Sequence, residues 1–147
     1  MKSQTYHTES EDETIALGER IAAELSAPAV VLLIGELGAG KTTLAKGIVK
    51  GLGAATPDDV SSPTFTLIHE YSPTVYHIDL YRLDTAAQVA TLGLDEIFDR
   101  RAVVLIEWGE RFPELMPEQR LEIRLRADGE NSREIELGST MELILPQ

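Results

Sequence analysis

Residues 35–42, with the sequence GELGAGKT, have the residue types and spacing of a phosphate-binding loop. They fit the pattern G-x-x-x-x-G-K-S/T at every fixed position. Glycines let a backbone curl so that several N–H groups point at phosphate oxygens. Lys41 would bring a full positive charge to the β- and γ-phosphates, and the Thr42 hydroxyl is a hard oxygen ligand suited to Mg²⁺. The sequence therefore predicts a site for a nucleoside triphosphate with Mg²⁺, whose loop residues are Gly38, Ala39, Gly40, Lys41, Thr42 and Thr43.

The segments on either side of this loop are those that such a site requires. Residues 29–34 are a continuous apolar run, which is typical of a strand buried on both faces. Residues 42–52 carry apolar side chains at helical spacing, so we expect a helix to follow the loop. The N-terminus of that helix would add a partial positive charge beside the phosphates.

Two acidic residues near the ends of other predicted strands are candidates for the metal and water positions. Glu107 follows the apolar run 102–106, so we expect it close to Mg²⁺, in the role of the Walker-B acid. Asp79 lies near the end of the predicted strand 75–82, where it could orient the attacking water or hold a metal-bound water. The alternatives are a solvated carboxylate for Glu107 and an ion pair with an arginine for Asp79.

Other side chains near these acids have two possible roles each. Thr64 could reach the γ-phosphate or Mg²⁺ from a loop, as switch segments do, or simply begin the next strand. Trp108 follows Glu107 and could lie beside the nucleotide, although a lone tryptophan more often packs in a core. His69 and His77 occur at strand spacing, and we expect them to be packed or exposed rather than metal ligands.

The composition excludes several classes of protein. The net charge of −12 argues against direct nucleic-acid binding, so a partner would have to hold any RNA. The absence of cysteine rules out disulfides, thiolate metal sites and cysteine nucleophiles. No apolar run approaches the ~20 residues of a membrane span. The polar, acidic segment 1–13 does not resemble a signal peptide, so we expect a cytoplasmic location.

The pattern of elements predicts an α/β fold. We expect a single P-loop NTPase domain over residues 1–147, built as a three-layer α/β/α sandwich with a mixed, mainly parallel central sheet and antiparallel C-terminal edge strands. A capping box at Ser10 and Glu13 predicts the start of a helix that ends near residue 26. The other expected elements are a helix over 85–100 and strands over 64–71, 75–82, 102–108, 121–126, 134–137 and 141–145.

Missing motifs narrow the choice of nucleotide and reaction. The one asparagine, Asn131, does not begin an N-K-x-D motif, so ATP is favoured over GTP, and the H-R-D and D-F-G motifs of protein kinases are also absent. A small-molecule kinase remains the main alternative, although it usually needs a lid, and the unassigned segments 54–62 and 109–119 are short. A nucleotide-responsive binding module without turnover is the third possibility.

Five sequence blocks occur together and in order: GELGAGKTT at 35–43, SSPTFTL at 61–67, VYHIDLYRL at 75–83, LGL at 92–94 and LIEW at 105–108. The loop alone is generic, whereas the H-x-D-L-Y-R and L-x-E-W blocks are specific. Through these blocks, and over roughly residues 10–137, the chain resembles the TsaE family (formerly YjeE) of bacterial tRNA threonylcarbamoyladenosine biosynthesis.

The resemblance implies a weak ATPase that acts with TsaB and TsaD, which carry threonylcarbamoyl to an adenosine of tRNAs that read ANN codons. ATP binding and hydrolysis would reset that complex, and tRNA would be contacted only through the partners. Lys41 and Thr42 would hold phosphate and Mg²⁺, and Glu107 would be the metal-linked acid. The remaining roles implied are a second essential acid for Asp79, a switch-like segment for Thr64, and residues flanking the nucleotide for Glu11 and Arg133.

Overall fold

The computed structural model describes residues 2–61 and 67–140. Its strands form one seven-stranded sheet in the order β1-β7-β6-β2-β5-β4-β3. The strands are β1 (Lys2–Thr8), β2 (Ala29–Ile34), β3 (Ile68–Ser72), β4 (Val75–Asp79), β5 (Val103–Glu107), β6 (Leu121–Ala127) and β7 (Arg133–Ser139). The helices are α1 (Glu11–Ala23), α2 (Lys41–Gly51), α3 (Ala86–Ala90) and α4 (Leu94–Phe98), and short 3₁₀ turns are η1 (Pro57–Asp59), η2 (Gly109–Arg111) and η3 (Pro113–Leu115).

The sheet is mixed, as predicted, but it is not mainly parallel. Strand β2 pairs in parallel with β5 and β6, and β4 pairs in parallel with β5. The other three pairings, β1 with β7, β6 with β7 and β3 with β4, are antiparallel. The C-terminal strands β6 and β7 do form the predicted antiparallel pair, but the edge of the sheet beside them is occupied by β1.

Strand β1 was absent from the sequence-based prediction. Its residues, KSQTYHT, include a single large apolar side chain, so no apolar run marks the strand. Alternation is nevertheless present, because Thr8 is buried and Tyr6 packs against the core while Thr5 and His7 are exposed. An edge strand of this kind depends on its hydrogen bonds to β7, and polar edges are common because they resist unwanted pairing.

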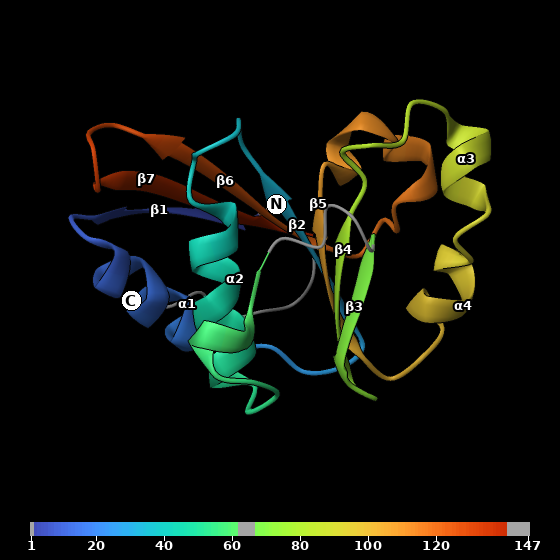
Figure 1. Ribbon diagram of the computed structural model, residues 1–147, viewed down its shortest axis with the longest axis horizontal. Coiled ribbons are helices and arrows are strands. Elements are labelled where there is room, and N and C mark those ends of the chain that lie inside the picture. The colour runs from blue at the N-terminus through green and yellow to red at the C-terminus, as the bar shows by residue number, and fades with distance from the viewer. Residues whose placement is uncertain (1, 62–66, 141–147) are drawn as a thin grey trace.

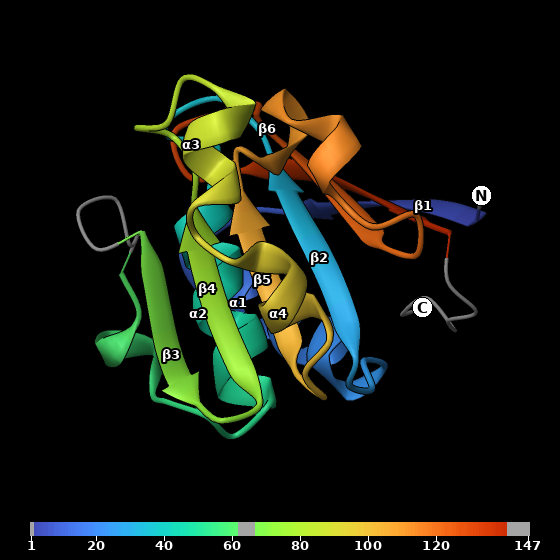
Figure 2. The same cartoon turned by 90° about the vertical axis from the view of Figure 1, so that its right-hand side faces the viewer.

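Helices cover both faces of the sheet, with α1 and α2 on one face and α3 and α4 on the other (Figure 1 and Figure 2). Alternate side chains of the central strands therefore enter two separate cores. Val31, Leu33 and Leu105 belong to the core beneath α1 and α2, whereas Leu32 and Ile106 belong to the core beneath α3 and α4. Burial on both faces explains why β2 and β5 read as continuous apolar runs.

Glycines bring α1 and α2 into close contact. A Cβ at Gly18 would lie 2.6 Å from the Leu44 carbonyl oxygen, and one at Gly47 would collide with the Ile15 carbonyl. The start of α1 is also fixed, because the Ser10 hydroxyl accepts a bond from the Glu13 N–H at 3.1 Å, as the capping box predicted. Helix α2, whose first residue is Lys41, is therefore held against α1 along its length.

Two predicted elements differ in extent from those observed. The expected helix 85–100 is two short helices, because Gly93 adopts a left-handed φ of 71° between them. Strand β3 begins at Ile68, after Leu67 with a φ of 65°, and the expected start of this strand over residues 64–66 lies outside the described residues. Thr64 and the expected strand 141–145 lie outside the described residues.

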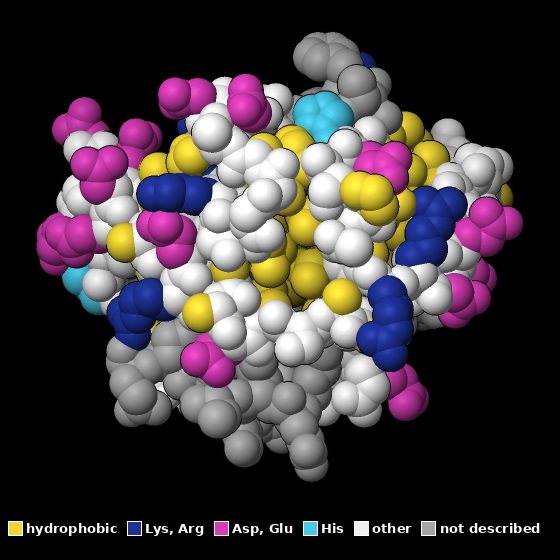
Figure 3. Space-filling view, turned by 90° about the horizontal axis from the view of Figure 1, so that it is seen from below, with side chains coloured by type: hydrophobic (Ala, Val, Ile, Leu, Met, Phe, Trp, Pro, Cys, Tyr) yellow, Lys and Arg dark blue, Asp and Glu magenta, His cyan; other side chains and the backbone are white. Residues whose placement is uncertain are grey.

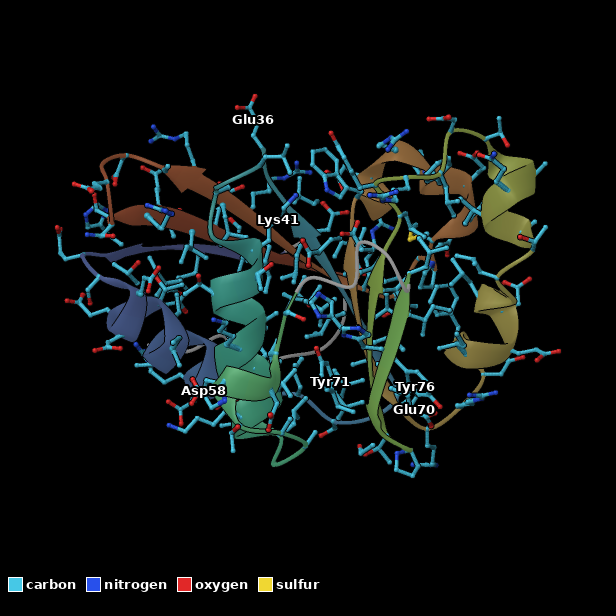
Figure 4. The ribbon with its side chains drawn as sticks, in the orientation of Figure 1. Glu36, Lys41, Asp58, Glu70, Tyr71 and Tyr76 are labelled. Carbon is cyan, nitrogen blue, oxygen red and sulfur yellow. The ribbon has the colours of Figure 1, made fainter. Side chains whose placement is uncertain are left out.

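Of the helices that the structure describes, none has the length and apolar character needed to cross a membrane. Figure 3 shows the end of the molecule that faces down in Figure 1. Hydrophobic side chains gather in a hollow at the middle of this surface, and charged side chains of both signs surround it. The glycine-rich loop 35–42, which contains Glu36 and Lys41, lies at the opposite end of the sheet (Figure 4).

Candidate functional site

The segments that the sequence singled out meet at one edge of the sheet. Because β4, β5 and β2 run parallel, their carboxyl ends lie together, and ligands of open α/β sheets bind at such edges. The register places Asp79 beside Glu107, and Glu107 beside Leu33 near the start of the loop. A cavity of about 440 Å³ opens there, lined by Glu11, Leu37, Gly38, Gly40, Lys41, Thr42, Thr43, Asp79, Tyr81, Glu107, Trp108 and Arg133.

The loop backbone is shaped by glycines in left-handed conformations. Gly38 has a φ of 82° and Gly40 has a φ of 104°, values that other residues rarely adopt. Gly40 is the N-cap of α2 and has no side chain with which to cap the helix, and the first turn of α2 carries no acidic residue. Gly40 therefore offers no side-chain oxygen to accept from the first N–H groups of α2, and these groups could donate to an anion.

The ammonium of Lys41 is buried inside the curl of the loop, and the residue is 5% exposed. Its Nζ atom donates to the Gly35 carbonyl at 2.6 Å and lies 3.7 Å from the centroid of the Trp108 ring. Burial lowers the pKa of Lys41, and the carboxylates of Glu107, Glu110 and Asp79 oppose that shift. The loop thus holds a cation whose cost of burial a phosphate group would relieve.

Two buried carboxylates face this cation from the ends of neighbouring strands. Asp79 and Glu107 are each 3% exposed. The Oδ1 atom of Asp79 accepts a bond from the Tyr81 N–H at 2.9 Å, which fixes the turn after β4. The Oε2 atom of Glu107 lies 2.6 Å from Nε2 of the fully buried His77. Glu107 is thus a buried acid rather than the solvated one considered as the alternative.

Trp108 leaves β5 with a left-handed φ of 68°, which is rare for a large side chain. This conformation turns its ring over Lys41 and into contact with Tyr81, at a centroid separation of 5.1 Å. The turn that carries Tyr81 is held in turn by Arg111, which donates to the Tyr81 and Leu83 carbonyls at 2.9 Å each. Strained backbone at the wall of a cavity is a frequent mark of a functional site.

Arg133 reaches the loop from the first residue of β7. Its Nη2 atom donates to the Gly38 carbonyl at 3.3 Å, and its Nη1 atom donates to the Ser132 carbonyl at 2.8 Å. The Nε atom is buried and has no partner among the residues that the structure describes. The C-terminal hairpin therefore brings a guanidinium to the wall of the cavity, and α1 contributes Glu11.

Comparison with known proteins decides the family. Residues 8–135 match the family model described as "Threonylcarbamoyl adenosine biosynthesis protein TsaE". The chain belongs to the TsaE family. It is 41% identical over 138 residues to a tRNA threonylcarbamoyladenosine biosynthesis protein TsaE of Bacillus subtilis, an alignment that covers 92% of this chain and 85% of that relative. TsaE of Haemophilus influenzae is 36% identical over 126 residues, with 80% and 78% coverage.

A solved structure supports the same conclusion. The crystal structure of Bacillus subtilis YdiB superposes with a TM-score of 0.76 at 35% sequence identity, covering 94% of this chain and 86% of that one. The resemblance to TsaE that the five sequence blocks indicated is therefore confirmed. The mixed α/β fold with one sheet is shared with that structure.

Of the predicted site residues that the structure describes, all line the cavity of this TsaE chain except Ala39. Ala39 is buried in the core beneath α1 and α2 and borders a neighbouring groove. Its N–H donates to the Glu36 carbonyl at 3.0 Å, within the turn of the loop. Thr64 lies outside the described residues.

The sequence analysis did not assign three residues that the structure places at the site. Leu37 and Tyr81 line the cavity and are 71% and 43% exposed, and His77 contacts Glu107. Leu37 falls at a variable position of the loop motif, so its type carried no signal. His77 and Tyr81 lie inside the H-x-D-L-Y-R block, two residues to either side of Asp79, and that spacing was the available clue.

Proposed function

We propose that this chain binds ATP with Mg²⁺ in the cavity, hydrolyses it slowly on its own, and serves tRNA threonylcarbamoyladenosine synthesis together with TsaB and TsaD. The observation that carries the proposal is the convergence of a buried lysine, a helix N-terminus and two buried carboxylates on one cavity. Other P-loop proteins use the same set of groups for phosphate and metal. The family assignment supplies the pathway.

The phosphates are held by groups that the structure already aims at the cavity. Lys41 exchanges its bond to the Gly35 carbonyl for the β- and γ-phosphates, and the first N–H groups of α2 bind the same oxygens. Arg133 and Glu11 flank the nucleotide, one from the C-terminal hairpin and one from α1. The bound triphosphate adds negative charge beside the buried ammonium, which the Asp79 and Glu107 carboxylates already face.

The donors present fit Mg²⁺. The hydroxyl of Thr42 and the carboxylate of Glu107 are oxygen ligands that line the same cavity. Among the described residues there is no group of three or more His, Asp or Glu side chains placed to hold a metal by themselves. Mg²⁺ needs no such cage, because it keeps several waters and takes its other ligands from phosphates. When bound, it would neutralise charge that develops on the phosphate oxygens.

Hydrolysis requires a water aimed at the γ-phosphorus, and we assign the orientation of that water to Asp79. Its carboxylate is buried, lines the cavity and lies beside Glu107 in the strand register. The water would attack phosphorus as the bond to the ADP oxygen breaks, giving phosphate and ADP. Because Arg133 donates to several carbonyls of its own hairpin and loop, we expect little help from it in the isolated protein, and hydrolysis should be slow.

ATP is favoured over GTP because the guanine-reading N-K-x-D motif is missing. The main rival, a small-molecule kinase, would need a lid that closes over the cavity. Segment 109–119 does not supply one, since Phe112 and Met116 are buried in the core beneath α3 and α4. The net charge of −12 fits a subunit that leaves tRNA to its partners, TsaB and TsaD, in the modification of ANN-reading tRNAs.

Three measurements test this proposal. Calorimetric titration should show ATP binding that Lys41→Met weakens by roughly 10–150-fold, the value of a charged hydrogen bond, whereas Lys46→Met in the same helix leaves it unchanged. Phosphate release should fall with Asp79→Asn but not with Asp84→Asn, whose side chain is 84% exposed. Phosphate release should rise when a TsaB–TsaD pair is added, and threonylcarbamoylation of an ANN-reading tRNA should require the wild-type chain.

Two outcomes would contradict the proposal. One is ATP binding that Lys41→Met leaves unchanged, and the other is transfer of the phosphate to a metabolite.

A further inference from the structure

His77 and Glu107 form the most buried polar contact at the site. His77 is fully buried, Glu107 is 3% exposed, and Nε2 lies 2.6 Å from Oε2. An ionised carboxylate only accepts hydrogen bonds, so the imidazole donates from Nε2. In a dry interior such a charge-assisted bond is short and strong, and it orients both partners.

The sheet register explains how His77 reaches this acid. In the parallel pair β4–β5, Asp79 lies beside Glu107 and His77 lies beside Leu105. His77 and Asp79 therefore point to the same face of the sheet, one approaching Glu107 from the core and the other standing beside it at the cavity. The His77 imidazole thus contacts the Glu107 carboxylate from the core. The side of that carboxylate that faces the cavity is left for a ligand.

The orientation of the His77 ring depends on Glu107. Its other nitrogen, Nδ1, is buried without a partner among the described residues. The ring of Tyr71 packs against it at a centroid separation of 6.3 Å and an interplanar angle of 34°. Packing thus restricts the ring, and within the described part of the chain its hydrogen bond to Glu107 sets its orientation.

We propose that His77 is a positioning residue that holds the Glu107 carboxylate in the orientation required by Mg²⁺. The inference rests on the proposed function, in which Glu107 serves the metal. Hydrogen-bond partners of metal-binding side chains fix the direction of the ligand lone pairs, and losing one commonly weakens metal binding by about 10–100-fold. His77 itself touches neither nucleotide nor metal in this scheme.

The neighbouring strand supplies a matched control. His69 on β3 is the direct cross-strand partner of His77, but its Nδ1 atom lies 3.3 Å from the Tyr71 hydroxyl and the residue is only partly buried. Replacing either histidine removes an imidazole from the same region of the sheet. Only the His77 change removes a donor from Glu107.

The test measures metal binding rather than turnover. Mn²⁺ is titrated into protein saturated with a non-hydrolysable ATP analogue, and water-proton relaxation reports the bound ion. We expect His77→Leu to weaken Mn²⁺ binding by about 10–100-fold, and His77→Gln, whose amide can still donate to Glu107, to restore most of it. His69→Gln should leave it unchanged. Binding of the analogue in EDTA should be the same in all variants.

A double substitution separates positioning from general damage. In a Glu107→Gln background, His77→Leu should weaken Mn²⁺ binding no further, because the two residues act through one contact. If His77→Leu unfolds, His77→Asn, whose amide is too short to reach Glu107, replaces it with the same expectation. Wild-type affinity for Mn²⁺ in His77→Leu or in His77→Asn overturns this inference alone. Two other outcomes overturn the proposed metal role of Glu107 as well. One is that the wild-type protein with the analogue binds no Mn²⁺, and the other is that Glu107→Gln binds Mn²⁺ as tightly as the wild type.

Discussion

The Nζ atom of Lys41 lies 3.7 Å from the centroid of the Trp108 ring and 2.6 Å from the Gly35 carbonyl oxygen. The loop lysine therefore has partners within the protein before any nucleotide arrives, although they do not offset the cost of its burial. Cation–π contacts of this kind are worth about 0.5–2 kcal/mol, less than the charged hydrogen bonds that a phosphate offers. We expect a triphosphate to draw the ammonium away from the indole.

This displacement should be visible in fluorescence. Trp108 is the single tryptophan of the chain, so its emission has one source. Adding ATP should change the emission of the wild-type protein as the cation leaves the ring, and Lys41→Met should abolish most of that response. Emission that stays constant while calorimetry shows the site to be filled would contradict the displacement.

Stability without nucleotide should depend on the charge of Lys41. Because burial lowers its pKa from 10.5, the folded chain holds this proton less firmly than the unfolded chain does. The resulting loss of stability is complete below the folded pKa and disappears as the pH rises towards 10.5. Lys41→Met should therefore raise the melting temperature at neutral pH, and the gain should shrink in alkaline buffer. Thermal melts at several pH values, with Lys46→Met as the control, measure the difference.

The burial of Glu110 should lower stability at high pH, whereas the burial of Lys41 lowers it at low and neutral pH. Burial raises its pKa above 4.5, and its Oε1 atom is buried without a hydrogen-bond partner among the described residues. The folded chain therefore loses stability as the pH rises from 4.5 to that raised pKa, and nothing is lost below 4.5. Glu110→Gln should raise the melting temperature at pH 7, because it removes the charge that burial disfavours. The same variant should match the wild type in acidic buffer, and an equal gain at both pH values would argue against this cause.

The guanidinium of Arg133 should contribute to nucleotide affinity. It lines the cavity, and its Nη2 atom already contacts the loop at Gly38. Arg133→Ala should weaken ATP binding by roughly 10-fold or more, as expected for a charged hydrogen bond. Arg126 on the same hairpin pairs with Glu134, and its side chain is 66% exposed, so Arg126→Ala is the control. Equal losses in both variants would point to a damaged hairpin instead.

The contact between α1 and α2 should be sensitive to a single methyl group. A Cβ at Gly47 would collide with the Ile15 carbonyl, and backbone cannot move aside as a flexible side chain can. Gly47→Ala should destabilise the protein by about 1–3 kcal/mol and should also weaken ATP binding, because it displaces the helix that begins at Lys41. Lys46→Ala, one residue earlier, should change the free energy of unfolding by less than about 0.5 kcal/mol. Urea denaturation and calorimetry provide the two measurements.

The sequence predicted those parts of the site whose residues lie close together along the chain. The loop around Lys41 is contiguous, so its motif located it without knowledge of the fold. Glu107 and Asp79 could be placed because apolar runs mark the strands that carry them. The contact of His77 with Glu107 spans 30 positions and exists only in one register of β4 against β5, which the spacing of the sequence does not encode.

The fold was predictable to the same degree. Continuous apolar runs marked β2 and β5, since both faces of these strands are buried. Strand β1 carries few apolar residues and is defined by its pairing with β7, so no pattern of apolar side chains indicated it. Gly93 divides the expected helix 85–100 through a backbone angle, which a helical pattern of side chains does not show.

The pairing of β1 with β7 has a practical consequence for anyone handling this protein. Thr8 lies opposite Arg133, so the β1–β7 pairing at the edge of the sheet also fixes the backbone of Arg133 at the wall of the cavity. Deleting residues 2–8 would leave the backbone N–H and C=O groups along one side of β7 unpaired. A strand of a second copy could then pair with them. Loss of β1 should therefore cause self-association and weakened nucleotide binding together.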